Sequence, residues 1–485
     1  MSTQVFARGG HAVRVTLHDD AAGLAFMTPT PDVRAAFDRV VLAMLAHRVE
    51  LPGLLQDLLR ADPDCVMGHA VAGLQQMLLA RSEARQVSGG HLAAAREAMR
   101  RRGATSRERH FVSALAAWQE CGEMEVAADR LESQLAAVPL DAAALKLSHA
   151  IRFMLGDAAA MRLAIERALP AWRGEHRAAF PFVLGCHAFA LEETGDHPAA
   201  ERIGREAVER DPADVWGAHA VAHVLETDGR ARDGLRWLAA AERHRAEIGG
   251  FARHLSWHAA LCHLHLGDGD AALALYDRCI RDEPSEEYRD VANAASLLWR
   301  LEAQRVPVGA ARWDELADIA ERRIGDHSLA FADLHHVLSL AATGRKCALE
   351  AFLAGMRGRA LRDVDSQARV IASVGLLVAQ AVAAALGDDP GEATDLLQAL
   401  GAGLQRLGGS HAQRDLLARI GLDAALAARD LDAAEAQFDE RLALRRAGAW
   451  ETACSRRLES LRQSGRPPSR GRAMGLSDII MVARV

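Results

Sequence analysis

Apolar residues recur at helical spacing through most of this 485-residue chain, and glycines interrupt them at regular intervals. The clearest unit is HLSWHAALCHLHLGDGDAALALYDRCIRDEP, residues 254–284. It predicts two helices joined by a turn at Gly267, because apolar side chains three and four residues apart share one helix face. Ala272 is the small residue where the helices cross, Tyr276 fills the core face of the second helix, and Pro284 ends that helix.

The same order of turn glycine, small residue, large apolar residue and proline returns with a period of about 34 residues. Further turns are predicted at Gly122, Gly195, Gly229, Gly344, Gly387 and Arg429-Asp430. This spacing is the tetratricopeptide pattern, in which each helix pair buries its apolar face on its neighbours. We therefore predict an all-α fold, a tetratricopeptide-repeat (α-solenoid) right-handed superhelix of antiparallel helix pairs. The first helix of each pair is expected to line a concave inner surface.

The repeat pattern divides the chain into five parts. We expect an N-terminal helical cap, repeats with a histidine-rich concave face, an insertion or connection that breaks the period, C-terminal repeats, and a tail. Their bounds are residues 1–64, 65–302, 303–326, 327–462 and 463–485.

Composition agrees with this fold and excludes several classes of function. Half of the residues are apolar but only 5% are aromatic, which favours helices over a β-sandwich or barrel. The net charge of −7 argues against a nucleic-acid or anionic-membrane partner. The seven cysteines form no CxxC pair and the first residues resemble no secretory signal, so we expect a cytoplasmic protein with reduced thiols. The longest apolar stretch, residues 370–386, is predicted to be a buried repeat helix.

Several runs match beyond the turn and crossing positions that all such repeats share. They are LGCHAFALEETGD (184–196), WGAHAVAHVLETDGR (216–230), HLSWHAALCHLHLGD (254–268), ANAASLLWRLE (292–302), RWDEL (312–316) and GGSHAQRD (408–415). In these runs the chain resembles the tetratricopeptide repeat protein 38 family over residues 100–450. The resemblance implies a cytosolic all-α repeat fold, and it attaches no activity to the chain.

Histidine is the compositional anomaly, with 21 residues outside any tag or tract. The turn glycines fix the register of the first helices, so the inward-facing positions follow from helical geometry. These positions hold His219, His223, Glu226, His254, His258 and His265, with Glu192 and Glu193 in the preceding unit. Three consecutive helices are therefore predicted to present imidazoles and carboxylates to one wall.

Two interpretations of this wall stay open. The histidines could hydrogen-bond backbone or carboxylates between repeats, or they could form a pocket in which imidazole beside a carboxylate acts as a general base near pH 7. On the second interpretation the candidate catalytic residues are His219, His223, Glu226, His254 and His258. The candidate substrate-binding residues are Glu192, Glu193, Trp216, Trp257, His265, His411 and Arg414.

A divalent transition metal is a candidate cofactor, although acid–base chemistry needs none. The run HAVAH (219–223) places His219 and His223 one helical turn apart, a geometry that zinc or iron can use, and Glu226 or His258 could supply a third ligand. The run differs from HExxH because it lacks the glutamate that serves as the built-in base.

His411 and Arg414 lie near the start of a later predicted helix, where a helix N-terminus could hold an anionic group. The alternative is that Ser410 caps the helix and Arg414 pairs with a neighbouring carboxylate.

Two functions remain possible. The first is a small-molecule enzyme that holds a polar or anionic substrate in the inner groove. The second is an interaction scaffold that grips a peptide or protein partner there. Histidine, glutamate and tryptophan at the inner positions suit a compact polar ligand, and we favour the enzyme.

Overall fold

The computed structural model describes residues 3–6, 13–19, 25–28, 30–174, 177–362 and 364–464. This part of the chain is almost entirely α-helical, as the sequence predicts. It divides into two compact units, Met1–Val221 with Ala241–Phe251, and Ala222–Ala240 with Ala252–Val485. All but the first two residues of the predicted tail, 463–485, lie outside the described residues.

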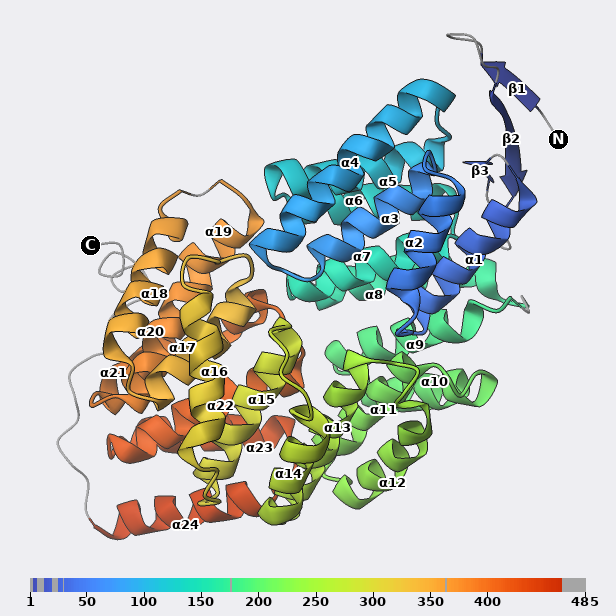
Figure 1. Cartoon of the computed structure of the whole chain (residues 1–485). Helices are drawn as coiled ribbons and strands as arrows, with labels where there is room; N and C mark the ends of the chain where they lie inside the picture. The colour runs from blue at the N-terminus through green and yellow to red at the C-terminus, as the bar shows by residue number, and fades with distance from the viewer. Residues whose placement is uncertain are drawn as a thin grey trace. The chain divides into compact units, whose positions relative to one another are not determined.

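The helices of the first unit form consecutive packed pairs, among them α3 with α4, α5 with α6 and α9 with α10 (Figure 1). Its helices are α1 (Pro31–Leu45), α2 (Leu51–Ala61), α3 (Val66–Met77), α4 (Ser82–Arg102), α5 (Ser106–Cys121), α6 (Met124–Ala137), α7 (Ala142–Met154), α8 (Ala158–Trp172), α9 (Phe180–Glu193) and α10 (His197–Arg210). The division between the units falls within α11 (Val215–Thr227), α12 (Ala231–Ala241) and α13 (Gly250–His265), and η1 (Glu242–His244) follows α12.

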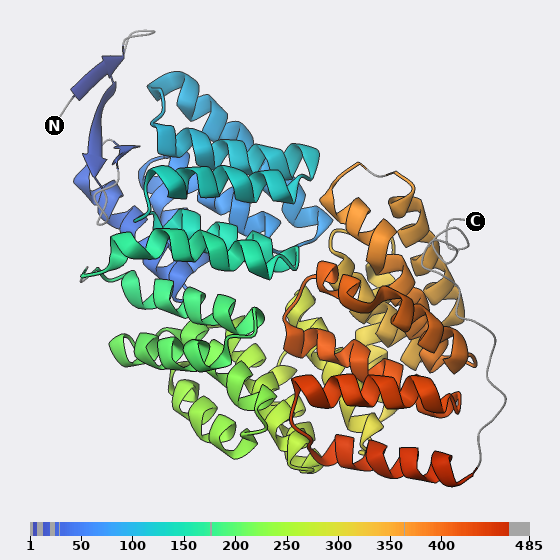
Figure 2. The same cartoon turned by 180° about the vertical axis from the view of Figure 1, so that it is seen from behind.

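In the second unit, α20 packs on α21 and α22 on α23. Figure 2 shows α22, α23 and α24 side by side in orange to red. The elements are α14 (Gly269–Leu275), η2 (Tyr276–Ile280), α15 (Tyr288–Ala303), α16 (Ala310–Arg322), α17 (Ala330–Ala342), α18 (Lys346–Ala360), α19 (Ser366–Val370), η3 (Ile371–Gly375), α20 (Leu376–Leu386), α21 (Pro390–Leu400), η4 (Gly401–Leu407), α22 (His411–Ala427), α23 (Leu431–Leu444) and α24 (Ala449–Gln463).

All but one of the predicted turn glycines adopt the left-handed conformation of a tight helix–helix turn, and the exception is Gly387, whose φ is −90°. Gly122, Gly195, Gly229 and Gly267 have φ between 71° and 83°, the left-handed region in which a side chain is strained. A further turn of the same kind occurs at Gly156, between α7 and α8. These local signals explain why the helix pairs begin and end where the sequence predicts.

The first helices of several pairs are buried on nearly every side. In α9 every residue from Phe182 to Glu192 is buried, and in α15 the same holds from Asp290 to Leu301. Second helices such as α10 are amphipathic and bury only one face. Polar side chains on the first helices therefore lie inside packed protein, where their hydrogen-bond and charge partners decide their chemistry.

Two segments differ from the expected organisation. Where a helical cap is predicted over residues 1–64, strands β1 (Thr3–Phe6), β2 (Val13–Asp19) and β3 (Ala25–Thr28) form an antiparallel sheet in that order before α1 and α2. Thr3 pairs with Thr16 and Thr16 with Thr28. The run VRVTLHD in β2 alternates apolar and polar residues, which is the period of a strand. In the predicted insertion, 303–326, α16 buries Trp313 and packs on α17.

The longest apolar stretch belongs to one continuous run of α19, η3 and α20. Among the described residues, this run, Ser366–Leu386, is the one helix that is long and apolar enough to cross a membrane. Its most apolar window is 56% buried inside the protein. A core helix passes the same test of length and composition, so the run is weak evidence for a membrane span.

The connection between α23 and α24 folds back onto the beginning of the second unit. The backbone N–H of Arg446 donates to the carbonyl oxygen of Thr227 at 3.2 Å. Gly448 lies so close to His265 that a Cβ there would meet the ring at 2.6 Å. This contact places the side chains of residues 445–451 beside the ends of α11 and α13.

Candidate functional site

Two helices bring the inward histidines of the second unit together. His254 and His258 lie one turn apart on α13, and His223 lies on α11. The ring centroids of His223 and His258 are 4.5 Å apart, and those of His254 and His258 are 4.8 Å apart. His223 and His258 have no exposed surface. The helical register that the sequence predicts thus brings these three imidazoles into contact.

Glu226 links this histidine cluster to the returning chain. Its Oε2 lies 3.6 Å from His258 Nδ1, and its Oε1 accepts a 2.8 Å hydrogen bond from Arg445 Nη1. Burial would raise the pKa of Glu226, but the Arg445 guanidinium and the nearby His258 ring outweigh it, so the pKa is lowered. Arg445 Nη2 also donates to His411 Nδ1 at 2.9 Å. Glu226 is therefore an ionised carboxylate held between an imidazole and a guanidinium.

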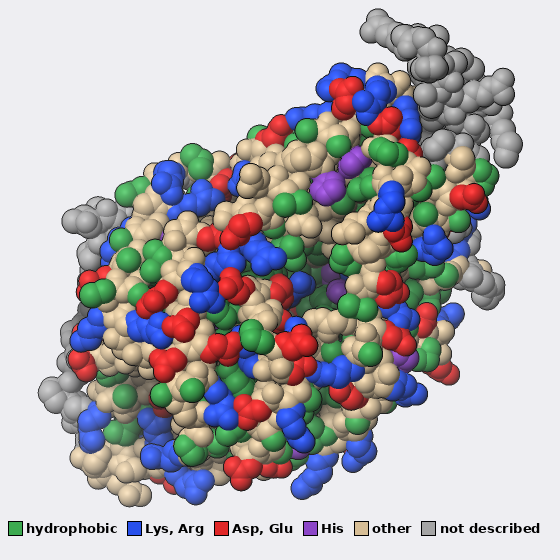
Figure 3. Space-filling model, in the orientation of Figure 1, with side chains coloured by type: hydrophobic (Ala, Val, Ile, Leu, Met, Phe, Trp, Pro, Cys, Tyr) green, Lys and Arg blue, Asp and Glu red, His purple; other side chains and the backbone are tan. Residues whose placement is uncertain are grey.

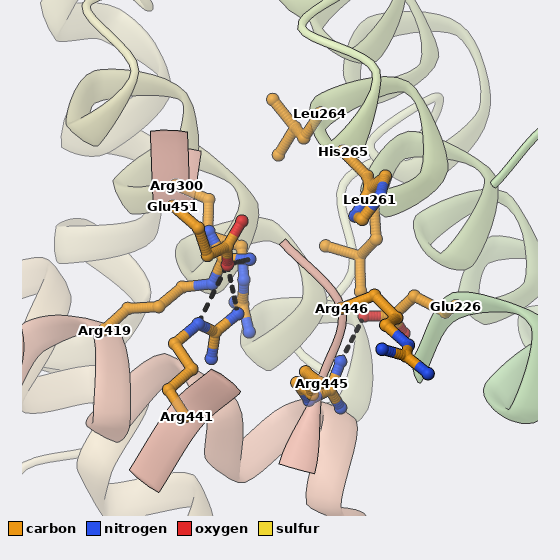
Figure 4. Close-up of a pocket in the computed structure, with 10 residues that line it drawn as sticks. All are labelled: Glu226, Leu261, Leu264, His265, Arg300, Arg419, Arg441, Arg445, Arg446 and Glu451. Carbon is orange, nitrogen blue, oxygen red and sulfur yellow. Dashed lines mark hydrogen bonds and ion pairs between the residues drawn. The ribbon is translucent and has the colours of Figure 1, made fainter. Parts of the chain in front are cut away.

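A pocket lies next to this carboxylate (Figure 4). Its cavity volume is about 20 Å³, which is room for about one water molecule, and the cavity opens to solvent. In Figure 4, Arg419 and Arg441 converge on Glu451, while Arg445 reaches Glu226. Its lining consists of Glu226, Leu261, Leu264, His265, Arg300, Arg419, Arg441, Arg445, Arg446 and Glu451. Arginines outnumber carboxylates in this lining, so the pocket is cationic.

A carboxylate outside the pocket lining, Asp415, organises the arginines. Asp415 on α22 accepts from Arg419 Nε at 2.8 Å and from Arg441, and Arg445 Nε lies 3.5 Å from it. Glu451 contacts Arg441 Nη2 at 2.7 Å and accepts from the Gly448 N–H at 2.8 Å. These charges fix the arginine side chains before any ligand arrives, which lowers the entropy cost of binding.

The positive charges of the pocket exceed what the carboxylates neutralise. Arg300 is 1% exposed and donates to the carbonyl oxygens of Ser296 and Ala412, each at 3.1 Å. Burial, followed by repulsion from Arg419, lowers the pKa of Arg300 to about 9, so the side chain stays charged at pH 7. Figure 3 shows basic and acidic side chains interspersed over the drawn face, in contrast to the arginine excess in the pocket.

The structure places the remaining sequence-predicted site residues as follows. His265 lines the pocket, and burial lowers its pKa, so the imidazole is neutral at pH 7. Trp257 stacks on His254 at 5.4 Å and donates to Ser296 Oγ at 3.1 Å. Arg414 donates to the carbonyl oxygens of Gly408 and Gly409, so it holds the loop before α22.

Other predicted residues belong to the first unit. His219 stacks on Phe189 with ring centroids 5.2 Å apart and lies 5.1 Å from the Trp216 ring. Glu192 is buried and Glu193 is half-buried, both at the end of α9. In the second unit, Ser410 caps α22 and forms a capping box with Gln413, which is the Ser410 part of the alternative considered for that helix start.

Sequence reasoning pointed to Arg300 of α15 as a residue that could line the groove, but it missed the other arginines of the pocket, which come from α22, α23 and the connection that follows α23. It also missed Lys146 in the first unit. This lysine is 6% exposed, donates to His47 Nε2 at 2.9 Å, and lies 4.4 Å from the centre of the Trp216 ring. Burial lowers its pKa, while Cys186 and Asp214 act in the opposite direction. A basic residue inside an alanine-rich helix gave no pattern by which to find it.

Replacing Lys146 by methionine should stabilise the protein at pH 7 by about 1 kcal/mol, because a buried charge is exchanged for an apolar side chain of similar size. Because the pKa of Lys146 is lower in the folded protein, the unfolded chain binds more protons than the folded chain at pH values between the folded pKa and 10.5. Wild-type stability should therefore rise with pH across that interval. Urea unfolding at pH 7 to 10 measures both effects, and the exposed Lys346→Met is the control. The prediction would be contradicted if the free energy of unfolding of the wild type changed with pH no more than that of Lys146→Met.

The donor set suits more than one ligand class. His223, His254 and His258 each offer a ring nitrogen within 4.8 Å of the others, so these residues could hold a metal ion. The arginine-lined pocket beside Glu226 offers guanidinium donors for carboxylate or phosphate groups. No protein-family model matches this chain.

Proposed function

We propose that the helix pairs are tetratricopeptide-type repeats stacked in a superhelix, as in the tetratricopeptide repeat protein 38 family that the sequence resembles, and that the chain is a cytoplasmic protein. Support comes from the recurring turns. The left-handed glycines Gly122 and Gly156, and again Gly195 and Gly229, are 34 residues apart in the sequence. Helix pairs follow one another along the chain in the order that stacked repeats require.

We further propose that the second unit is a small-molecule enzyme that binds an anionic substrate and acts on it by histidine acid–base chemistry. The observation that carries this proposal is the pocket in which preorganised arginines surround a neutral imidazole and an ionised carboxylate. Guanidinium groups bind carboxylate and phosphate with paired N–H donors and fix the orientation of the anion.

Within this proposal the pocket residues have distinct roles. Arg446 is exposed and lies at the pocket lining, where it can meet an incoming anion. His265 is the candidate base, because a neutral imidazole in the lining can accept a proton from a bound substrate. Glu226 and Arg445 are positioning residues, since each holds the other and Arg445 also fixes His411.

Anion binding tests the proposal directly. Phosphate, sulfate, citrate and an acidic peptide are titrated against the full chain at constant ionic strength, by calorimetry and by thermal unfolding. We expect a free polyvalent anion to bind and Arg446→Met to weaken binding about tenfold, which is the loss of one charge-assisted contact. The control is Arg236→Met, because Arg236 is exposed on α12 and pairs with Asp233 outside the pocket lining.

The outcomes separate the two functions that the sequence leaves open. If only the acidic peptide binds, and Arg446→Met weakens it, the chain is an interaction scaffold with a carboxylate-binding groove. If no anion binds more tightly than chloride, or if both arginine variants weaken binding equally, the anionic-substrate proposal is wrong.

A further inference from the structure

The histidines beside the pocket form a second candidate site, built from residues other than the pocket arginines. We propose that His223, His254 and His258 bind one divalent transition metal ion, with zinc the best match. This inference stands independently of the proposed anionic substrate. The first observation is proximity, because one ring nitrogen from each histidine lies within 4.8 Å of the other two.

The second observation is the orientation of the rings. His258 Nδ1 faces Glu226 Oε2 at 3.6 Å, and His254 Nδ1 lies 3.1 Å from Asn293 Oδ1. At His254 the oxygen acceptor holds the proton on Nδ1 and leaves Nε2 deprotonated, whereas the 3.6 Å contact of His258 is longer than a hydrogen bond. In metalloproteins, a metal-bound histidine commonly donates its other ring N–H to a carboxylate or carbonyl oxygen in this way. His254 is thus already in the tautomer that a metal requires, and Glu226 lies on the Nδ1 side of His258.

The same reasoning excludes the neighbouring groups as ligands. His411 lies 5.3 Å from His223 between ring centroids, but its Nδ1 accepts from Arg445, so its Nε2 carries the proton. Both oxygens of Glu226 face other groups, one Arg445 and one His258. Of the two third ligands considered from the sequence, Glu226 and His258, the proposed site therefore uses His258, and Glu226 supports that histidine.

The chemistry of the donors selects the metal class. Three imidazole nitrogens without a thiolate or a direct carboxylate suit zinc, cobalt, nickel or copper better than magnesium or calcium. Tetrahedral zinc requires Zn–N distances of about 2.0–2.1 Å. The nitrogens must therefore draw together on binding. Three protein ligands leave a fourth position for water, the arrangement of catalytic rather than structural zinc sites.

Metal stoichiometry of the full chain is the test. The purified protein is stripped with a chelator, dialysed, and titrated with Zn²⁺ and with Co²⁺, and bound metal is measured by elemental analysis. We expect about one zinc per chain and the intense visible bands of tetrahedral Co²⁺. His223→Ala and His258→Ala should each weaken zinc binding by at least tenfold. Asn293→Ala removes a hydrogen-bond partner of His254 but none of the three proposed ligands, and it should weaken zinc binding by about tenfold.

A matched control comes from the first unit. His69 Nδ1 and His91 Nδ1 lie 3.2 Å apart, a pair that could bind zinc adventitiously. His91→Ala should leave zinc stoichiometry and the Co²⁺ spectrum unchanged. Folding of each variant is checked by circular dichroism, and Asn293→Ala gives the answer if a histidine variant does not fold. Absence of saturable binding by the wild type, or loss of zinc in His91→Ala alone, would overturn the proposal, whatever the anion titrations give.

Discussion

Asp415→Asn should destabilise the protein by about 3–5 kcal/mol, the cost of removing one partner from a buried ion network. The side chain is 5% exposed and lies among Arg419, Arg441, Arg445 and Arg300, whose nearest nitrogens are all within 4 Å of it. Asparagine keeps the shape but removes the charge, so these guanidinium groups would repel one another without compensation. Chemical denaturation at pH 7 measures the loss.

The pH dependence of the same variant provides an internal check. Burial would raise the pKa of Asp415, but Arg441, Arg445 and Arg419 together hold it well below its ordinary value of 3.8. A lowered folded pKa contributes stability above the unfolded pKa, and this contribution is lost as pH falls through the folded pKa. Wild-type stability should thus decline on acidification below about pH 4 more steeply than that of Asp415→Asn.

A surface carboxylate serves as the matched control for this prediction. Asp233 also contacts two arginines, Arg230 and Arg236, but its side chain is 41% exposed. Because water screens such pairs, Asp233→Asn should change stability by less than about 0.5 kcal/mol. If Asp415→Asn is as mild as Asp233→Asn, the arginine network does not stabilise the fold in the way its geometry indicates.

Arg445→Met should cost about 3–5 kcal/mol for a different reason, since it leaves Glu226 buried without its guanidinium partner. Both side chains are 9% exposed, and the pair joins α11 to the connection after α23. Adding Glu226→Gln to Arg445→Met should recover part of the loss, because the unpaired charge is then removed. The double-mutant cycle should give a coupling of about 1–3 kcal/mol. Strictly additive losses would contradict the pairing.

The fold was predictable wherever local pattern decides it. Helix pairs follow from apolar spacing, and the turns at Gly195, Gly229 and Gly267 follow from the need for a positive φ that glycine adopts without strain. The short alternating segments before residue 30 were missed, because each is too brief to outweigh a helical reading of the chain that follows.

The candidate site, like the fold, was predictable only where local sequence spacing decides it. That His254 and His258 share a face of α13, and that His223 and Glu226 share a face of α11, follows from helical periodicity alone. The sequence also predicts that these faces carry chemistry, because imidazoles and carboxylates are costly to bury without partners. What it predicts as an open concave wall is in fact packed, with His223 and His258 fully buried.

The sequence by itself thus determined the helical architecture, most of its turns and the residues that share one face of a helix, since each depends on spacings of a few residues. Only the tertiary structure decided which charges meet. Arg445 and Glu226 are 219 residues apart in the chain, yet they form the hydrogen bond at the pocket. Arginines look alike in a sequence whether they are solvated or buried. Their role becomes specific when the fold brings distant carboxylates within a few ångströms, where low solvent exposure makes the interaction strong.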